Sequence, residues 1–253
     1  MSLAIKKKFP NFYRFSKNIT NHIPMKGFLW NNKSYNFNYR IYKMIKTWNQ
    51  GALKEEADFV YKYYDGGDFV DVGSWAGFYS FLLSPKAEHE NHFVSCEPDH
   101  SIHHEILENL SILKKNFSKI NYSLISLPVA NGKEVVTYHD VWGHPCFLES
   151  DQIEDINVKS KKKFNSITVD NIVSSLSLKP TFIKIDTEGA EFDVLKGMKQ
   201  TLVNFKPKIM LEKHPTMIPK NITLEIINNF LKENGYKAEL IDKSDIAIRE
   251  IWK

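Results

Sequence analysis

Cysteine is scarce in this sequence, and long apolar runs are missing. The two cysteines among 253 residues, Cys96 and Cys146, are too few for a disulfide framework, and their spacing does not suit a zinc site. No run of about 18 apolar residues offers a membrane-spanning helix. No apolar leader followed by a small-residue cleavage site is present near the first residue. We therefore expect a cytoplasmic protein with one sizeable core.

Acidic residues are absent from the first 54 positions, which carry eleven Lys or Arg residues among many aromatic and Asn residues. The rest of the chain holds 23 basic and 30 acidic residues. We expect a basic, aromatic extension over residues 1–49 and a main domain over residues 50–253. Such an extension suits an anionic membrane surface, nucleic acid or an acidic glycan. Packing of its aromatic residues on the main domain is the favoured alternative, so no specific nucleic-acid partner is predicted.

From residue 50 onward, short apolar runs alternate with amphipathic stretches, a pattern typical of a mainly parallel sheet covered by helices on both faces. Residues 140–163 interrupt the rhythm and are expected to form an irregular insertion. The last strand is expected to be antiparallel, at the edge of the sheet. The expected strands are 68–73, 92–97, 120–126, 133–139, 181–187, 208–214, 236–241 and 246–252, and the expected helices are 52–64, 77–84, 99–115, 166–176, 190–205 and 222–235.

The glycine pattern of a dinucleotide site, G-x-G-x-x-G, is also missing. The first strand is followed by "DVGSWAGFYS", in which Gly73 and Gly77 are four positions apart. This spacing disfavours an NAD-dependent oxidoreductase. Without a Cβ, Gly73 can let a ligand approach the backbone closely, although a plain tight turn is the alternative.

An acidic residue ends the next strand, in "SCEPDH". Glu97 lies where the ribose-binding acid of a βαβ nucleoside site belongs, and a carboxylate can accept hydrogen bonds from two vicinal hydroxyls. The alternative is an exposed glutamate at a strand end. Together with the glycine turn, the ribose role is favoured.

A cation and several carboxylates surround the end of a later strand, in "FIKIDTEGAEFDVLKG". Lys184 and Asp186 are two positions apart and share one face of the strand, so Lys184 can neutralise Asp186. In "LEKH", Glu212 and His214 are likewise two apart. Ligands of open α/β sheets bind at the carboxyl ends of the strands, so these side chains, with Glu188, are expected to converge on one pocket.

These segments carry a family resemblance. The motifs "FVDVGSWAGFYS", "EPD", "ITVDNI", "FIKIDTEGAEFDVLKG" and "KPKIMLEKHP" occur in the order typical of the FkbM-type methyltransferases, over about residues 50–215. The resemblance implies a Rossmann-like, mostly parallel seven-stranded sheet. It also implies methyl transfer from S-adenosylmethionine to a hydroxyl of a sugar, glycan or small natural product. The family commonly has Ala-Asn after "DVG", whereas this chain has Ser74 and Trp75.

The resemblance also implies where the cofactor lies. The glycine turn is expected to meet its methionine end, the "EPD" segment its ribose and the "PVANG" turn its adenine. The residues concerned are Asp71, Gly73, Ser74 and Gly77, then Glu97 and Pro98, then Val129, Ala130 and Asn131.

Methyl transfer is an in-line displacement that depends mainly on positioning. A hydroxyl acceptor must also lose its proton, and His214 is the expected general base. Asp186 is the alternative, either as a base with a raised pKa or as a group that orients the acceptor. A divalent metal held by Asp186, Glu188 and a third oxygen is a further option that the spacing does not favour. For Lys184 and Asp186 a purely structural ion pair is also open.

Acceptor contacts are expected from the irregular stretch, because long loops in compact domains are often functional. His139, Trp142 and His144 are the candidates, with Trp142 suited to stacking on a sugar. The sequence thus predicts an O-methyltransferase that uses S-adenosylmethionine. A non-catalytic nucleoside-binding module and an NAD-dependent oxidoreductase are the alternatives, and the sequence does not define the oligomeric state.

Overall fold

The computed structural model describes residues 24–30, 33–38, 43, 46, 51–87, 90–139, 145–149 and 162–253. The chain divides into two compact units, residues 1–54 and 55–253. In the first unit, β1 (Pro24–Trp30) pairs with β2 (Lys33–Asn38) as an antiparallel hairpin whose register shifts between Met25 and Phe28. Among the described residues, no helix is long and apolar enough to cross a membrane.

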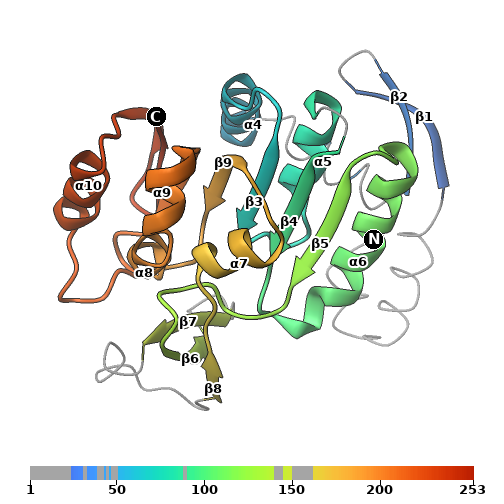
Figure 1. Ribbon diagram of the computed structural model, residues 1–253. Helices are drawn as coiled ribbons and strands as arrows, with labels where there is room; N and C mark the ends of the chain where they lie inside the picture. The colour runs from blue at the N-terminus through green and yellow to red at the C-terminus, as the bar shows by residue number, and fades with distance from the viewer. Residues whose placement is uncertain are drawn as a thin grey trace, which may run out of the picture. The chain divides into compact units, whose positions relative to one another are not determined.

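The second unit is built on a seven-stranded sheet with the strand order β11-β12-β10-β9-β3-β4-β5 (Figure 1). The strands β3, β4, β5, β9 and β10 run parallel to their neighbours of that group, which confirms the expected mostly parallel sheet. The bounds of these strands are β3 (Asp68–Val72), β4 (His92–Cys96), β5 (Asn121–Ile125), β9 (Pro180–Ile185), β10 (Lys208–Lys213), β11 (Ala238–Lys243) and β12 (Ile248–Trp252).

Alternation along the strands places two different cores on the two faces of the sheet. Phe69, Phe93 and Phe182 point to one face, where Tyr64 packs edge-on against all three rings. The other face carries aliphatic residues, such as Val70 and those at equivalent positions, packed against α7 (Val169–Ser175), α8 (Glu191–Lys196), α9 (Lys199–Phe205) and α10 (Leu224–Glu233). The remaining helices are α4 (Gly51–Tyr63), α5 (Phe78–Leu83) and α6 (His103–Asn116).

The last strand is not at the edge of the sheet, contrary to expectation. The strand β12 is antiparallel to both β10 and β11 and lies between them, so β11 forms the edge. Burial explains the order, because Ile251 and Trp252 are fully covered whereas β11 exposes Ala238 and Leu240.

The expected helix over residues 190–205 is two helices, α8 and α9, separated by Gly197 and Met198. A Cβ on Gly197 would lie 2.1 Å from the carbonyl oxygen of Ala130, so the turn after β5 packs directly on the break. Helix periodicity could not show this, because the apolar spacing continues across the break.

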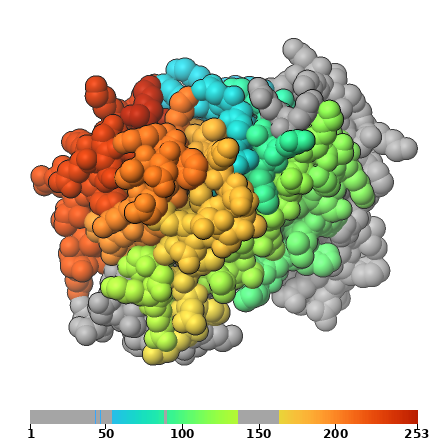
Figure 2. Space-filling model, in the orientation of Figure 1, coloured from blue at the N-terminus to red at the C-terminus, as the bar shows by residue number. Residues whose placement is uncertain are grey.

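The stretch 140–163 was expected to be irregular, but part of it forms strands. It contributes β7 (Pro145–Glu149) and the start of β8 (Lys162–Asn165), which flank β6 (Glu134–His139) in an antiparallel three-stranded sheet. In the space-filling view, coloured atoms of β6 and β8 lie together at the lower edge of the unit (Figure 2). The arrowheads of β3 and β5 point toward this same side (Figure 1). The small sheet therefore belongs to the side of the domain where the parallel strands end.

Candidate functional site

The order of strands in the sheet creates a switch point between β3 and β9. From β3 the chain proceeds to β4 on one side, whereas β9 is followed by β10 on the other. Ligands of open α/β sheets bind beyond the carboxyl ends of the strands at such a point. The predicted site residues on the "DVG", "EPD", "KIDTEG" and "LEKH" segments all follow or end the four strands around it.

The turn after β3 is shaped by contact with β9. Gly73 has a φ of 76°, and a Cβ there would lie 1.7 Å from the carbonyl oxygen of Asp186. The backbone N–H groups of Gly73 and Ser74 both donate to the carbonyl oxygen of Cys96, at 3.0 Å. Gly73 was predicted to make room for a ligand. The structure shows a different reason for the glycine, because the neighbouring strand occupies that space.

Trp75 has a left-handed backbone, with φ 43°, and its residue is 58% exposed. A bulky aromatic residue in this region is strained, and Gly or Asn is the usual occupant. Its N–H donates to Oε2 of Glu97 at 2.9 Å. Gly77, with φ 77°, precedes α5 as its N-cap residue. The turn therefore holds one surface residue with a strained backbone, Trp75, next to Glu97, the ribose-binding candidate.

Glu97 is almost fully buried, and both of its carboxylate oxygens accept backbone hydrogen bonds. Oε2 accepts from Trp75 and Oε1 accepts from the N–H of Asp99 at 2.9 Å. Burial raises the pKa of Glu97, and these two hydrogen bonds oppose the shift. The carboxylate is thus held in one orientation, and each oxygen keeps a further lone pair for a hydroxyl donor. Pro98 follows it and is partly exposed.

Lys184 is the buried cation at the switch point. Its Nζ donates to the carbonyl oxygen of Gly73 at 2.7 Å and to Oδ2 of Asp186 at 3.0 Å, and it lies 3.6 Å from Oδ1 of Asp71. Burial lowers the pKa of Lys184, but Asp186 and Asp71 outweigh that effect and raise it. Lys184 therefore stays charged and links β9 to the turn after β3.

Two buried polar groups beside this cation lack hydrogen bonds. Neither carboxylate oxygen of Asp71 nor the hydroxyl of Ser74 has a hydrogen-bond partner within the described part of the chain. Burial raises the pKa of Asp71 to about 6, and Lys184 opposes the shift. Buried polar groups are normally satisfied, so these atoms suit a polar ligand such as the aminocarboxylate end of a cofactor.

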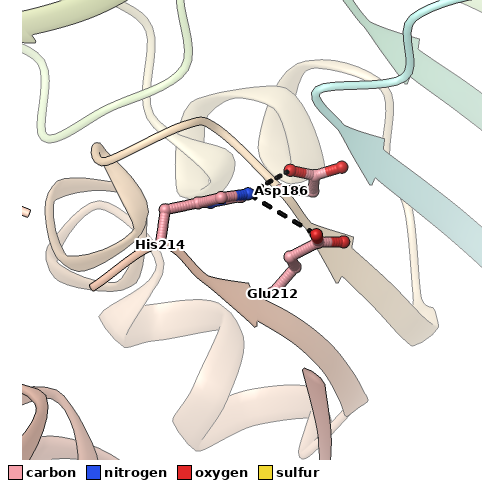
Figure 3. Close-up of side chains that lie close together, drawn as sticks. All are labelled: Asp186, Glu212 and His214. Carbon is pink, nitrogen blue, oxygen red and sulfur yellow. Dashed lines mark ion pairs between the residues drawn. The ribbon is translucent and has the colours of Figure 1, made fainter. Parts of the chain in front are cut away.

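His214 lies at the centre of the acidic residues that the sequence predicted to converge (Figure 3). Its Nδ1 is 3.0 Å from Oε1 of Glu191, with which it forms a hydrogen bond. Its Nε2 is 3.8 Å from Oδ1 of Asp186, 3.5 Å from Oε1 of Glu212 and 3.5 Å from Oε2 of Glu188. The convergence of Asp186, Glu188, Glu212 and His214 is therefore a property of the fold.

These contacts set the charge of the pair formed by His214 and Glu212. Burial lowers the pKa of His214, but its contacts with Glu191 and Glu212 reverse this and raise the pKa to about 11. Burial raises the pKa of Glu212, whereas His214 and Arg249 lower it to about 2. These carboxylate contacts favour the protonated form of His214, whereas a general base must be neutral, so the base role of His214 stays a prediction.

A second layer of charged residues behind Glu212 was missed by the sequence reasoning. Arg249 on β12 contacts Glu212 at 2.6 Å, Glu56 at 3.1 Å and Asp242 at 3.1 Å. Glu56 on α4 also accepts a hydrogen bond from the hydroxyl of Tyr79. The available signal was the position of Glu56, which lies on the apolar face of its helix between Leu53 and Val60.

Three of the remaining predicted residues lie on the turn after β5, and His139 lies on β6. Ala130 donates its N–H to the carbonyl oxygen of Ile167 at 2.9 Å, and the side-chain amide of Asn131 donates to Asp193 at 3.4 Å. Val129 forms a β-bridge with Ile167. His139 ends β6 opposite Pro145. Trp142 and His144 lie outside the described residues.

Comparison with known proteins identifies the family. Residues 64–238 match the Methyltransferase FkbM domain. A curated relative, the hexuronic acid methyltransferase AglP of Haloferax volcanii, is 28% identical over 156 residues, which cover 60% of this chain and 58% of that protein. The chain thus aligns with less than two thirds of this relative's length.

One solved structure shows the same fold, and a second is similar over most of its length. The methyltransferase FkbM from Methylobacillus flagellatus superposes with a TM-score of 0.50 at 18% identity, over 79% of this chain and 51% of that one. A putative rRNA methylase from Clostridium thermocellum gives a TM-score of 0.46 at 9% identity, over 81% and 96% of the two chains. The family match covers more than half of the chain and includes every strand-end motif described above, so this protein belongs to the FkbM methyltransferase domain family.

Proposed function

We propose that this chain is an S-adenosylmethionine-dependent methyltransferase that methylates a hydroxyl group of a sugar, free or within a glycan. The observation that carries the proposal is the convergence of acidic side chains from β3, β4, β9 and β10 on one switch point. Such a site favours a cationic ligand, and the sulfonium of the cofactor is a cation. The name of the curated relative supports a sugar as the acceptor.

The cofactor cradle is proposed from buried groups whose oxygen atoms lack hydrogen bonds to the described residues. Asp71 and Ser74 would take the methionine end, with Oδ1 of Asp71 also 3.6 Å from Nζ of Lys184. Glu97 would accept the ribose hydroxyls with its remaining lone pairs. When bound, the cofactor supplies an electrophilic methyl group. The chain has to position the acceptor in line with that group and exclude water.

The chain must also remove the proton of the acceptor. In the displacement, a bond forms between the acceptor oxygen and the methyl carbon, the carbon–sulfur bond breaks, and neutral S-adenosylhomocysteine leaves. Because the carboxylate contacts favour the protonated form of His214, we assign the proton to a carboxylate. Burial raises the pKa of Asp186 and of Glu188, so either side chain is a better base than an ordinary surface carboxylate.

The proposal is tested by cofactor binding and by turnover, measured separately. S-adenosylhomocysteine is titrated calorimetrically into the wild type and Glu97→Ala, with the exposed Asp65→Asn as the matched control. We expect Glu97→Ala to weaken binding by at least about tenfold, because it removes one or two charged hydrogen bonds, and Asp65→Asn to leave affinity unchanged. Equal affinity in all three proteins would refute the ribose role.

Turnover is tested with a panel of neutral sugars, uronic acids and glycans, and products are identified by mass spectrometry as acceptors that have gained one methylene unit. Methyl transfer to a sugar hydroxyl supports the proposal. Tight binding of S-adenosylhomocysteine without transfer to any acceptor would favour a nucleoside-binding module, and tight binding of NADH would favour an oxidoreductase.

A further inference from the structure

The atoms facing His214 are spaced unlike a hydrogen-bonded cluster. One ligand-type atom from each of Asp186, Glu212 and His214 lies within 4.8 Å of the other two. The distances from Nε2 to the three nearest carboxylate oxygens are 3.5, 3.5 and 3.8 Å. Strong hydrogen bonds between such groups are about 2.7–2.9 Å long. Ligand atoms around a tetrahedral ion with bonds of about 2.1–2.3 Å are about 3.4–3.8 Å apart. The three distances from Nε2 match the spacing expected for ligand atoms around an ion.

The imidazole ring is held from behind, so that Nε2 is presented to this gap. Nδ1 is bonded to Glu191, and Glu191 in turn accepts the N–H of Gly189 at 3.0 Å. The side chain of His214 is only 4% exposed, and its Nε2 faces carboxylate oxygens of Glu188, Glu212 and Asp186 at 3.5, 3.5 and 3.8 Å, longer than strong hydrogen bonds. A histidine oriented by a carboxylate on its other nitrogen is the usual arrangement behind a metal-binding histidine.

The carboxylates are only partly neutralised by the neighbouring cations. Lys184 contacts Oδ2 of Asp186, which leaves Oδ1 directed at His214 (Figure 3). Arg249 contacts Oε1 of Glu212. Five carboxylates, those of Asp71, Asp186, Glu188, Glu191 and Glu212, share three basic partners, Lys184, Arg249 and His214. The remaining negative charge favours a cation in the gap, and a divalent ion more than a monovalent one.

We infer that Asp186, Glu212 and His214 bind a divalent cation, which requires His214 to release its proton. Glu188 at the rim then remains as the base for the acceptor. One imidazole with carboxylates at this spacing suits Zn²⁺, with Mn²⁺ as a spectroscopically visible probe, better than Ca²⁺, which prefers oxygen ligands alone. The function of the ion rests on the proposed methyl transfer. Bound there, it supplies a Lewis acid that lowers the pKa of an acceptor hydroxyl and offsets the repulsion between an acidic acceptor and the carboxylates.

The site is tested with Mn²⁺ alone, without acceptor. Binding to the full chain is followed by calorimetry and by the loss of the free-ion electron paramagnetic resonance signal. We expect one ion per chain, and a rise in melting temperature with added Mn²⁺ because the ion binds the folded state. Asp186→Asn and His214→Ala should each weaken binding by at least about tenfold. The control His104→Ala removes an exposed histidine elsewhere and should bind as the wild type does.

The outcomes distinguish failure of the ion-binding site from failure of the proposed methyl transfer. S-adenosylhomocysteine affinity and circular dichroism establish that each variant is folded. If the wild type binds no Mn²⁺ at millimolar concentration, or if His214→Ala binds it as tightly as the wild type, the inference is wrong. Binding of Mn²⁺ without methyl transfer to any acceptor supports the site and contradicts the proposed function. Full methyl transfer in chelator, with rates that Mn²⁺ does not change, overturns the catalytic role of the ion.

Discussion

Three glycines, Gly73, Gly77 and Gly197, allow backbone strain and steric overlap to be measured separately. Gly77 has a positive φ of 77°, and a Cβ added there would have Oγ of Ser95 as its nearest atom, at 3.9 Å. Gly197 has an ordinary φ of −82°, but a Cβ would lie 2.1 Å from the carbonyl oxygen of Ala130. Gly73 combines both features, with φ 76° and a Cβ 1.7 Å from a carbonyl oxygen. An alanine at Gly77 therefore tests backbone strain, one at Gly197 tests steric overlap, and one at Gly73 tests both.

The magnitudes follow from these geometries. Gly77→Ala should lose about 1–2 kcal/mol of unfolding free energy from the left-handed backbone alone. Gly197→Ala should lose about 1–3 kcal/mol, because the turn at Ala130 must move. Gly73→Ala should lose about 3–5 kcal/mol, since real Cβ contacts are essentially never under 3.0 Å and the obstructing carbonyl belongs to Asp186, whose N–H donates to Val72 in the sheet at 3.0 Å.

Urea denaturation gives the free energies, and thermal melts give shifts of about 2–4 °C per kcal/mol for a domain of this size. Calorimetry with S-adenosylhomocysteine then reports on the site, and Gly73→Ala should lose affinity because it separates β3 from β9. If Gly73→Ala were no more destabilising than Gly77→Ala, the close approach of β9 to this turn would be wrong.

Three further predictions concern single side chains. Burial, reinforced by Glu212, raises the pKa of Glu56 to about 8, so the folded state holds a proton that the unfolded state releases, and stability should fall as the pH rises from about 5 to about 8. In Glu56→Gln this decline should be smaller when unfolding is followed across that range, and parallel profiles would contradict the assignment. Trp75→Asn should raise the unfolding free energy by about 1 kcal/mol by relieving left-handed strain, and a destabilised variant in urea would instead show that the indole is held by packing. Cys96 is buried and burial raises its pKa, so in Cys146→Ser we expect thiol labelling only on unfolding, whereas rapid native labelling would contradict the burial.

Local patterns predicted the parallel sheet and the acidic cluster because their signals lie within short segments. The two-residue repeat predicted that Lys184 and Asp186 share one side, and likewise Glu212 and His214, although β9 ends at Ile185 and β10 at Lys213, just before the second member of each pair. The order of parallel strands then brings the two pairs together, which places His214 among Asp186, Glu188 and Glu212.

The charge state of the cluster depends on contacts that no local pattern shows. Arg249 reaches Glu212 from β12, 37 positions later in the chain, and the protonation of His214 results from the combined field of several carboxylates. Sequence spacing therefore identified the residues, but it could not show the contacts that favour the protonated form of His214. The split of the helix at Gly197 also depends on a distant backbone, that of Ala130.

The position of β12 between β10 and β11 has a consequence for the order in which the pocket folds. During synthesis β10, with Glu212, leaves the ribosome well before the residues of β12 that carry Arg249. Until β12 pairs with β10, the carboxylates around His214 lack the positive charge of Arg249, and one edge of β10 is unpaired. Assembly of the pocket is therefore a late event, and folding intermediates should be most vulnerable to proteases and aggregation along that flank.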